Sequence, residues 1–232
     1  MKTARLDYSK SGIWVGGLLL VSFIAFWPTY YSVFSGSGFY VHFHAFTAIT
    51  WFVLLIVQPI LIKNKKLSLH RFIGKLSYPV AGLIVLSILL LAHNKISNSP
   101  DSFYDIRTYI LYLQISLAFV FAVTYGLAIY HRKSKSIHSR LMVATSLTFI
   151  DPVLARLINS YLPDIGVSGQ WITFGIINMI LISLSIIDRN HRKARWVYPG
   201  LLMLYLLIEI PIYFDLTGLP WWQSFAAWFA TI

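Results

Sequence analysis

Five histidines in this sequence lie at positions where they could bind a haem or a metal ion. His70 and His138 each begin an apolar segment after a basic loop, in the stretches LSLHR and KSIHSR. Histidines that face each other across a helical bundle can serve as the two axial ligands of a haem b. His42, His44 and His93 lie at the opposite ends of apolar segments, where imidazole nitrogens could hold a divalent metal ion. The sequence therefore predicts a haem site at one end of these segments and a metal site at the other.

The same histidines also have ordinary structural interpretations. His42 and His44 are two residues apart, about 200° around a helix, so both cannot point at one centre. A histidine at the start of a membrane helix often rests in the polar headgroup layer. A His-Arg pair such as His70 with Arg71 can extend toward lipid phosphates. Both the ligand and the structural interpretation stay open for each histidine.

Polar residues within apolar segments predict a second site. Asp151 and Glu209 each precede a proline by one or two residues, and Arg156 and Gln58 also lie inside apolar segments. Ionisable residues inside membrane spans are costly, so they are candidates for function. We expect Asp151, Arg156, Glu209 and Gln58 to form a polar pocket for a proton, an ion or a substrate. The alternative is that these residues pair between helices and only stabilise the bundle.

The composition indicates the kind of fold that must position these residues. The chain has 232 residues, of which 57% are hydrophobic and 12% are charged, with a mean hydropathy of +0.68. Soluble domains carry about 25% charged residues. We therefore expect an all-α integral membrane protein in which residues 1–232 form a single bundle, because helices satisfy their own backbone hydrogen bonds in lipid. The chain has no cysteine, which excludes disulfides and thiolate ligands.

Seven segments have the length and apolar composition to cross a bilayer, at about 20 residues each. The expected seven-transmembrane-helix bundle has spans near 12–34, 41–62, 72–92, 108–130, 139–160, 170–187 and 196–214. The remaining residues, 215–232, are too few for another span. Their three tryptophans predict a short interfacial segment on the outer surface or, alternatively, a lid over the bundle.

The basic residues predict the orientation of the bundle. All of the 19 Lys and Arg residues except Lys95, Arg107 and Arg156 fall in the N-terminal segment or in loops on the same side. The positive-inside rule places the N-terminus in the cytoplasm and the C-terminus outside. The net charge of +11 then faces the anionic lipids of the inner leaflet rather than nucleic acid. We expect a multi-pass protein of the cell inner membrane whose partners are the lipid bilayer and other subunits of a membrane complex.

Two stretches of the sequence resemble a family of bacterial multi-span membrane proteins of unknown function. HFHAFTAITWFVLLIVQPILI, followed by LHRFIGKLS, is similar to their H-x(n)-W-x(n)-Q helix and H-R-x-x-G motif, and HSRLMVATSLTFIDPVLAR is similar to their next His-Arg helix. The resemblance covers about residues 41–160. A more distant resemblance is to the cytochrome b561 class, whose four-helix core holds two haems. It implies one haem between His70 and His138, whereas His44 lacks a partner histidine for a second.

These observations lead to two functional hypotheses. The first is an integral inner-membrane redox or electron-transfer protein that binds haem or a metal through histidines at both membrane faces. The second is a non-enzymatic transporter, or an assembly or structural subunit of a membrane complex, that uses the pocket of Asp151, Arg156 and Glu209. The common catalytic motifs, such as G-x-S-x-G, H-E-x-x-H and the P-loop, do not occur, so the sequence predicts no particular enzyme activity.

Overall fold

The computed structural model describes residues 8–100, 104–165 and 168–232, and within these ranges the fold is all-α, with no strand. The helices, in chain order, are η1 (Tyr8–Lys10), α1 (Ser11–Phe26), η2 (Tyr31–Gly36), α2 (Phe39–Lys63), α3 (Leu67–Ser97), α4 (Tyr104–Tyr130), α5 (Lys135–Ala144), η4 (Thr145–Phe149), α6 (Ile150–Tyr161), η5 (Pro163–Ile165), α7 (Ser168–Asp188), α8 (Val197–Tyr213), η6 (Leu216–Gly218) and α9 (Pro220–Thr231), where η marks a 3₁₀ helix. This agrees with the all-α fold predicted from the composition.

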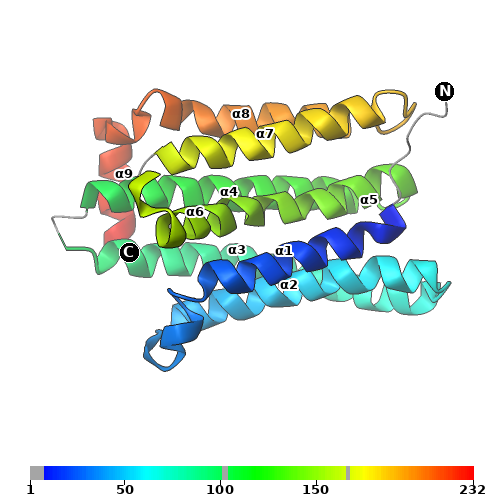
Figure 1. Ribbon diagram of the computed structural model, residues 1–232, viewed down its shortest axis with the longest axis horizontal. Helices are drawn as coiled ribbons and strands as arrows, with labels where there is room; N and C mark the ends of the chain where they lie inside the picture. The colour runs from blue at the N-terminus through cyan, green and yellow to red at the C-terminus, as the bar shows by residue number, and fades with distance from the viewer. Residues whose placement is uncertain (1–7, 101–103, 166–167) are drawn as a thin grey trace.

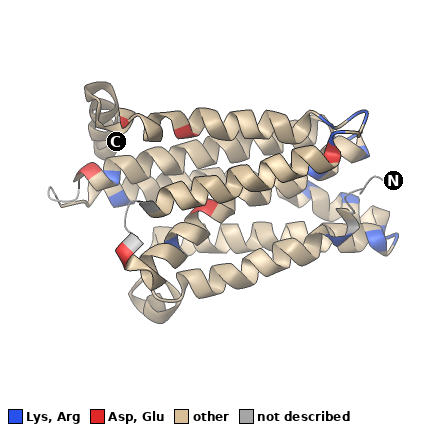
Figure 2. Cartoon of the chain, turned by 45° about the horizontal axis from the view of Figure 1, so that its top comes forward, with Lys and Arg blue, Asp and Glu red and all other residues tan. Residues whose placement is uncertain are grey.

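The long helices lie side by side in one bundle (Figure 1). Each packs against its neighbour in the chain, α1 on α2, α2 on α3, α3 on α4, α4 on α5 and α7 on α8, while α6 joins α1 to α7. The short helix α9 crosses the bundle at one end, which we call the α9 end. Most Lys and Arg residues gather at the opposite end, which we call the basic end (Figure 2).

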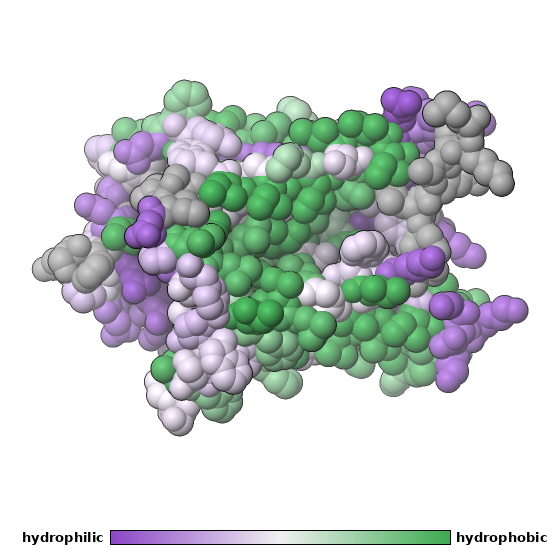
Figure 3. All heavy atoms as spheres, viewed as in Figure 1, coloured by the Kyte–Doolittle hydropathy of each residue, from purple (hydrophilic) through white to green (hydrophobic). Residues whose placement is uncertain are grey.

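An apolar surface covers the middle of the bundle between two polar ends (Figure 3). Among the described residues, five helical segments are long and apolar enough to cross a membrane, namely Phe39–Lys63, Leu67–Ser97, Tyr104–Tyr130, Lys135–Tyr161 and Gly169–Asp188. Helices α1 and α8 are also apolar, but they are shorter, with 16 and 17 residues. Five of the seven predicted spans therefore have the length of a membrane helix.

The first span is shorter than the sequence predicted. The apolar run over residues 12–34 is not one helix, because α1 ends at Phe26 and a separate 3₁₀ turn follows over Tyr31–Gly36. Pro28 explains the break, since proline lacks an N–H donor and disfavours helix in the residue before it. Hydropathy alone does not detect such an interruption.

The fifth span contains a 3₁₀ segment in its middle. The α-helical hydrogen bonding of α5 stops at Ala144, five residues continue as η4, and α6 resumes at Ile150. Pro152 fits here because the first turn of a helix tolerates proline. A 3₁₀ stretch inside a helix often marks a hinge. Asp151 lies just after it.

The C-terminal helix α9 is docked on the bundle. The indole of Trp222 is buried and donates from Nε1 to the carbonyl oxygen of Thr108 over 3.1 Å. Gln223 donates from Nε2 to the Thr108 hydroxyl, also over 3.1 Å. Trp221 and Trp228 remain exposed. The segment thus packs across the ends of α3 and α4 and keeps two tryptophans on its surface.

Candidate functional site

Asp151 is buried inside the bundle, with 4% of its surface exposed. It lies in the first turn of α6, beyond the 3₁₀ segment, and faces α7. Its Oδ1 accepts a hydrogen bond of 2.7 Å from the side-chain amide of Gln170. An amide supplies a donor but no charge, so this contact orients the carboxyl group without neutralising it.

Glu209 is a second buried acid in the same region, with no exposed surface. Its Oε2 accepts a hydrogen bond of 2.8 Å from Nδ2 of Asn178 on α7. Its Oε1 has no hydrogen-bond partner among the described residues. Tyr205, one turn before Glu209 on α8, lines a small cavity together with Asp151, so both acids neighbour the same side chain. Each acid is therefore held by one neutral amide from α7.

A buried tyrosine lies beside the acids. Tyr205 is four residues before Glu209 on α8, which places both on one helix face. Tyr205 also lines a small cavity together with Asp151. Its hydroxyl group has no hydrogen-bond partner within the described parts of the chain. We call Asp151, Glu209, Tyr205 and the two α7 amides the acid pocket.

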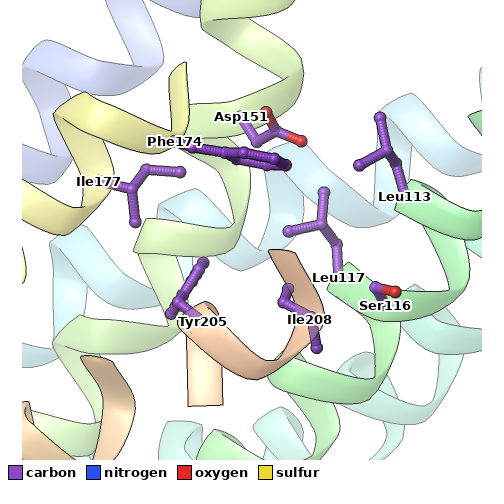
Figure 4. A pocket seen from close by; sticks show the side chains of 8 residues that line it. All are labelled: Leu113, Ser116, Leu117, Asp151, Phe174, Ile177, Tyr205 and Ile208. Atoms are coloured by element: carbon purple, nitrogen blue, oxygen red, sulfur yellow. The ribbon is translucent and has the colours of Figure 1, made fainter. Parts of the chain in front are cut away.

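A small cavity borders the acid pocket (Figure 4). Its walls are formed by Leu113, Ser116, Leu117, Asp151, Phe174, Ile177, Tyr205 and Ile208. Its volume is about 10 Å³, which leaves room for about one water molecule. In this conformation the cavity has no room for a solute or a cofactor. A proton, in contrast, can bind to a carboxyl group without any free volume beside it.

Among the described residues, no cation lies within ion-pair distance of the acids. Within the ranges that the structure describes, the one ion pair joins Arg140 to Asp188, at the other end of the bundle. Arg156, which we predicted in the same pocket, instead has its guanidinium carbon 5.7 Å from the centre of the Phe26 ring. An ionised carboxylate buried without a partner costs several kcal/mol. Each acid therefore needs a proton or a bound cation to be stable in this place.

Gln58 also lies outside the acid pocket, contrary to its predicted grouping. It faces α3 near the basic end, where its amide oxygen accepts from the Gly74 backbone N–H over 3.0 Å and its amide nitrogen donates to Nδ1 of His70. The physical reason is its position near the C-terminal end of α2, whereas Asp151 follows the middle of the fifth span. The two residues therefore lie at different depths along the bundle.

The three histidines predicted as metal ligands have separate partners. His42 makes a 3.0 Å hydrogen bond with the Tyr30 hydroxyl, and His44 bonds the buried Ser87 hydroxyl over 3.0 Å. His93 packs its ring edge-on against Phe229 of α9, with ring centres 5.6 Å apart. In the described parts of the chain, no three His, Asp or Glu side chains gather as a metal site. The predicted metal-binding histidine cluster is thus not supported.

The two histidines predicted as haem ligands lie at the basic end with different hydrogen bonds. His138 bonds the Ala128 carbonyl oxygen from Nδ1 over 2.8 Å. A carbonyl only accepts, so Nδ1 carries the proton and Nε2 keeps its lone pair. In His70 the Nδ1 contacts the side-chain amide of Gln58. His138 therefore has the Nδ1–H hydrogen bond to a carbonyl oxygen that ligating histidines commonly make, and His70 does not.

A buried ion pair at the basic end was not predicted from the sequence. Arg140 of α5 donates from Nε and Nη2 to the two carboxylate oxygens of Asp188 at the end of α7, the second bond measuring 2.7 Å. Its guanidinium lies over the Tyr8 ring, and the Tyr8 hydroxyl meets that of Tyr198 on α8. Burial raises the pKa of the Tyr8 hydroxyl, in η1, to about 12. The cluster ties η1, α5, α7 and α8 together.

The amides of the acid pocket were also missed. Gln170 and Asn178 are eight residues apart, a little over two helical turns, so both lie on the same side of α7. The spacing could have shown that the two amides share one face of the helix. It could not show that this face meets the acids, because that depends on the packing of α7 against α6 and α8.

Comparisons of the chain with protein-family models, with curated proteins and with solved structures gave no match. The class of protein is therefore defined by the fold and by the site alone. It is an all-α protein with several helices of membrane-spanning length and a buried acid pocket.

Proposed function

We propose that this chain is a proton-coupled transporter of the inner membrane, in which the acid pocket binds and releases the proton. The two acids, which the sequence hypothesis grouped with Arg156, act without that residue. Transport by alternating access places coupling sites near the middle of the membrane, at interrupted helices. Asp151 follows the 3₁₀ segment of the fifth span, which matches that arrangement.

The proposal includes seven spans, with the basic end in the cytoplasm. It is supported by the gathering of Lys and Arg at that end (Figure 2) and by five helices of full spanning length. Helix α1 rises about 24 Å by the helical repeat, less than the hydrocarbon core of about 30 Å. A short apolar helix is accommodated by local thinning of the bilayer at modest cost.

One observation carries the proposal. Two buried carboxyl groups share a site with uncommitted phenol and carboxyl oxygens, and among the described residues neither acid has a basic partner. Acids that only stabilise a bundle are expected to be paired, as Asp188 is with Arg140. Acids that exchange a proton must be able to exist in two states, and an immobile cation would prevent that.

The test is a pH titration of the purified protein by infrared difference spectroscopy, which detects the carbonyl stretch of a protonated carboxyl group. We expect buried carboxyl bands that titrate reversibly, one lost in Asp151→Asn and another in Glu209→Gln. Asp164→Asn, which removes an exposed acid of η5, is the matched control and should leave these bands in place. A spectrum without any band that depends on Asp151 or Glu209 would show that the acids do not exchange protons.

A haem- or metal-binding redox function is the second candidate. The observation that favours it is the hydrogen bond from His138 Nδ1 to the Ala128 carbonyl, because ligated histidines usually make such a bond. Purified protein grown with haem precursors should then show a Soret band that disappears in His138→Ala. His131→Ala, a neighbouring histidine in the loop after α4, should keep it. A colourless protein with no bound metal would remove this candidate.

A further inference from the structure

The ion pair at the basic end is the centre of a cluster of four side chains. Arg140 and Asp188 link α5 to the end of α7, and both side chains are buried. The centre of the Tyr8 ring lies 4.8 Å from the guanidinium carbon of Arg140. The hydroxyl group of Tyr8 is hydrogen-bonded to that of the buried Tyr198 on α8. We call these four residues the basic-end cluster.

The basic-end cluster joins opposite edges of the bundle. Helices α1 and α2 lie along one edge and α7 and α8 along the other (Figure 1). Tyr8 belongs to the first edge, because η1 packs against α1 and α2, and the buried Ser11 hydroxyl donates to the Tyr8 carbonyl oxygen over 2.8 Å. Its partner Tyr198 lies in the first turn of α8. One hydrogen bond thus spans the basic end.

A column of buried side chains connects the basic-end cluster to the acid pocket. Tyr198, Leu201 and Tyr205 are spaced by three and four residues, so they share one face of α8, and all three are buried. Tyr205 borders the small cavity beside Asp151, about 10 Å along the helix from Tyr198. The same hydrophobic core includes Leu141, Ala144, Leu147, Ile177 and Leu181.

Each helix of this column carries one residue of the cluster and one of the pocket. The fifth span has Arg140 before the 3₁₀ segment η4 and Asp151 after it. Helix α7 ends at Asp188 and holds the two pocket amides, and α8 carries both Tyr198 and Glu209. If the cluster came apart, these helices could separate at the basic end while their other ends stayed packed.

We propose that the basic-end cluster is a latch that closes the acid pocket toward the basic end, and that its release admits water to Asp151 from that side. An ion pair suits a reversible latch, because two buried charges lose much of their hydration and regain it when water enters. The latch controls access to the acid pocket, so its role rests on the proton exchange proposed there.

The test is the rate at which a water-soluble, charged methanethiosulfonate reagent modifies a thiol in the cavity wall. The chain has no cysteine, so Ser116→Cys supplies a single thiol there. With the latch intact we expect slow modification, because a cavity of about 10 Å³ excludes the reagent. Adding Asp188→Asn should raise the rate about tenfold or more. Tenfold corresponds to about 1.4 kcal/mol, less than the usual cost of removing one partner of a buried pair.

A milder variant and two controls make the result specific. Tyr8→Phe removes only the hydroxyl group and should also raise the rate, by a smaller factor, so it decides the question if Asp188→Asn fails to fold. Ser87→Cys places a thiol at a buried position between α2 and α3, outside the column, and should stay slow in every variant. Asp164→Asn, at an exposed acid, should leave the rate at Ser116→Cys unchanged.

Two results would overturn the latch. One is an unchanged rate at Ser116→Cys in the cluster variants, and the other is an equal acceleration at Ser87→Cys, which would indicate general loosening of the bundle. Thiol modification does not require that the acids titrate. Carboxyl bands that fail to titrate would therefore overturn the proposed function, whereas the labelling rates report on the latch separately.

Discussion

Replacing Asp188 by asparagine should reduce the free energy of unfolding by about 3–5 kcal/mol, the usual cost of removing one partner of a buried ion pair. Both side chains of the Arg140–Asp188 pair are nearly inaccessible, with 5% and 4% of their surface exposed. In the variant the guanidinium would keep its bond to the Ser136 carbonyl, 2.8 Å long, but lose its counter-charge. The loss should appear as unfolding at lower denaturant concentration in mixed micelles, followed by tryptophan fluorescence.

A double variant separates the cost of the orphaned charge from the value of the pair itself. Arg140→Met combined with Asp188→Leu removes both charges, and buried pairs replaced by apolar residues often lose little stability. We therefore expect the double variant to be more stable than Asp188→Asn alone. Asp164→Asn, at an exposed acid, should change stability by less than about 0.5 kcal/mol. Equal stability of Asp188→Asn and the wild type would mean that the pair contributes nothing to the fold.

Replacing Trp51 by alanine should cost about 3–5 kcal/mol, as expected when a large buried aromatic side chain is lost. Trp51 of α2 has no exposed surface, and its ring meets Phe121 and Tyr125 of α4 edge-on at 5.0 and 5.3 Å. Its Nε1 donates to the Thr145 hydroxyl over 3.0 Å, at the start of η4. One side chain thus links α2, α4 and the interrupted fifth span.

Two further variants divide that cost between packing and hydrogen bonding. Thr145→Val keeps the shape of the side chain but leaves the indole N–H unpaired, at about 1–3 kcal/mol. Trp14→Ala is the matched control, because Trp14 is 79% exposed on α1 and faces lipid or detergent. Denaturation in mixed micelles should rank the losses as Trp51→Ala, then Thr145→Val, then Trp14→Ala. A loss in Trp14→Ala as large as that in Trp51→Ala would contradict this account.

The sequence predicted the helical class well, because the composition of a membrane helix is imposed by the bilayer along its whole length. It predicted the length of the first span poorly, because a single proline, Pro28, outweighs the hydropathy around it. Asp151 and Glu209 could be selected as isolated acids in apolar segments. The structure places Arg156 against Phe26 and Gln58 against α3 rather than beside these acids, because the neighbours of a side chain depend on helix rotation and depth.

The hydrogen-bond partners of the two acids could be identified only from the fold. Gln170 and Asn178 are neutral amides. Placing a neutral amide in a membrane span costs less free energy than placing a charged residue there, so the sequence alone did not mark them as candidates. The Arg140–Asp188 pair was missed for a related reason. Both residues lie next to basic loops, where charged side chains are expected to be solvated, and only the packing of the basic end shows that they are buried.

The 3₁₀ segment η4 has a mechanical consequence for Asp151. A 3₁₀ helix turns about 120° and rises about 2.0 Å per residue, whereas an α-helix turns about 100° and rises about 1.5 Å. Rewinding the five residues of η4 as α-helix would rotate α6 by about 100° against α5 and draw it inward by about 2.5 Å. Such a screw motion would carry the carboxyl group of Asp151 from α7 toward a different face of the bundle. A change in helical pitch can thus move a charge sideways while both helices stay within the membrane.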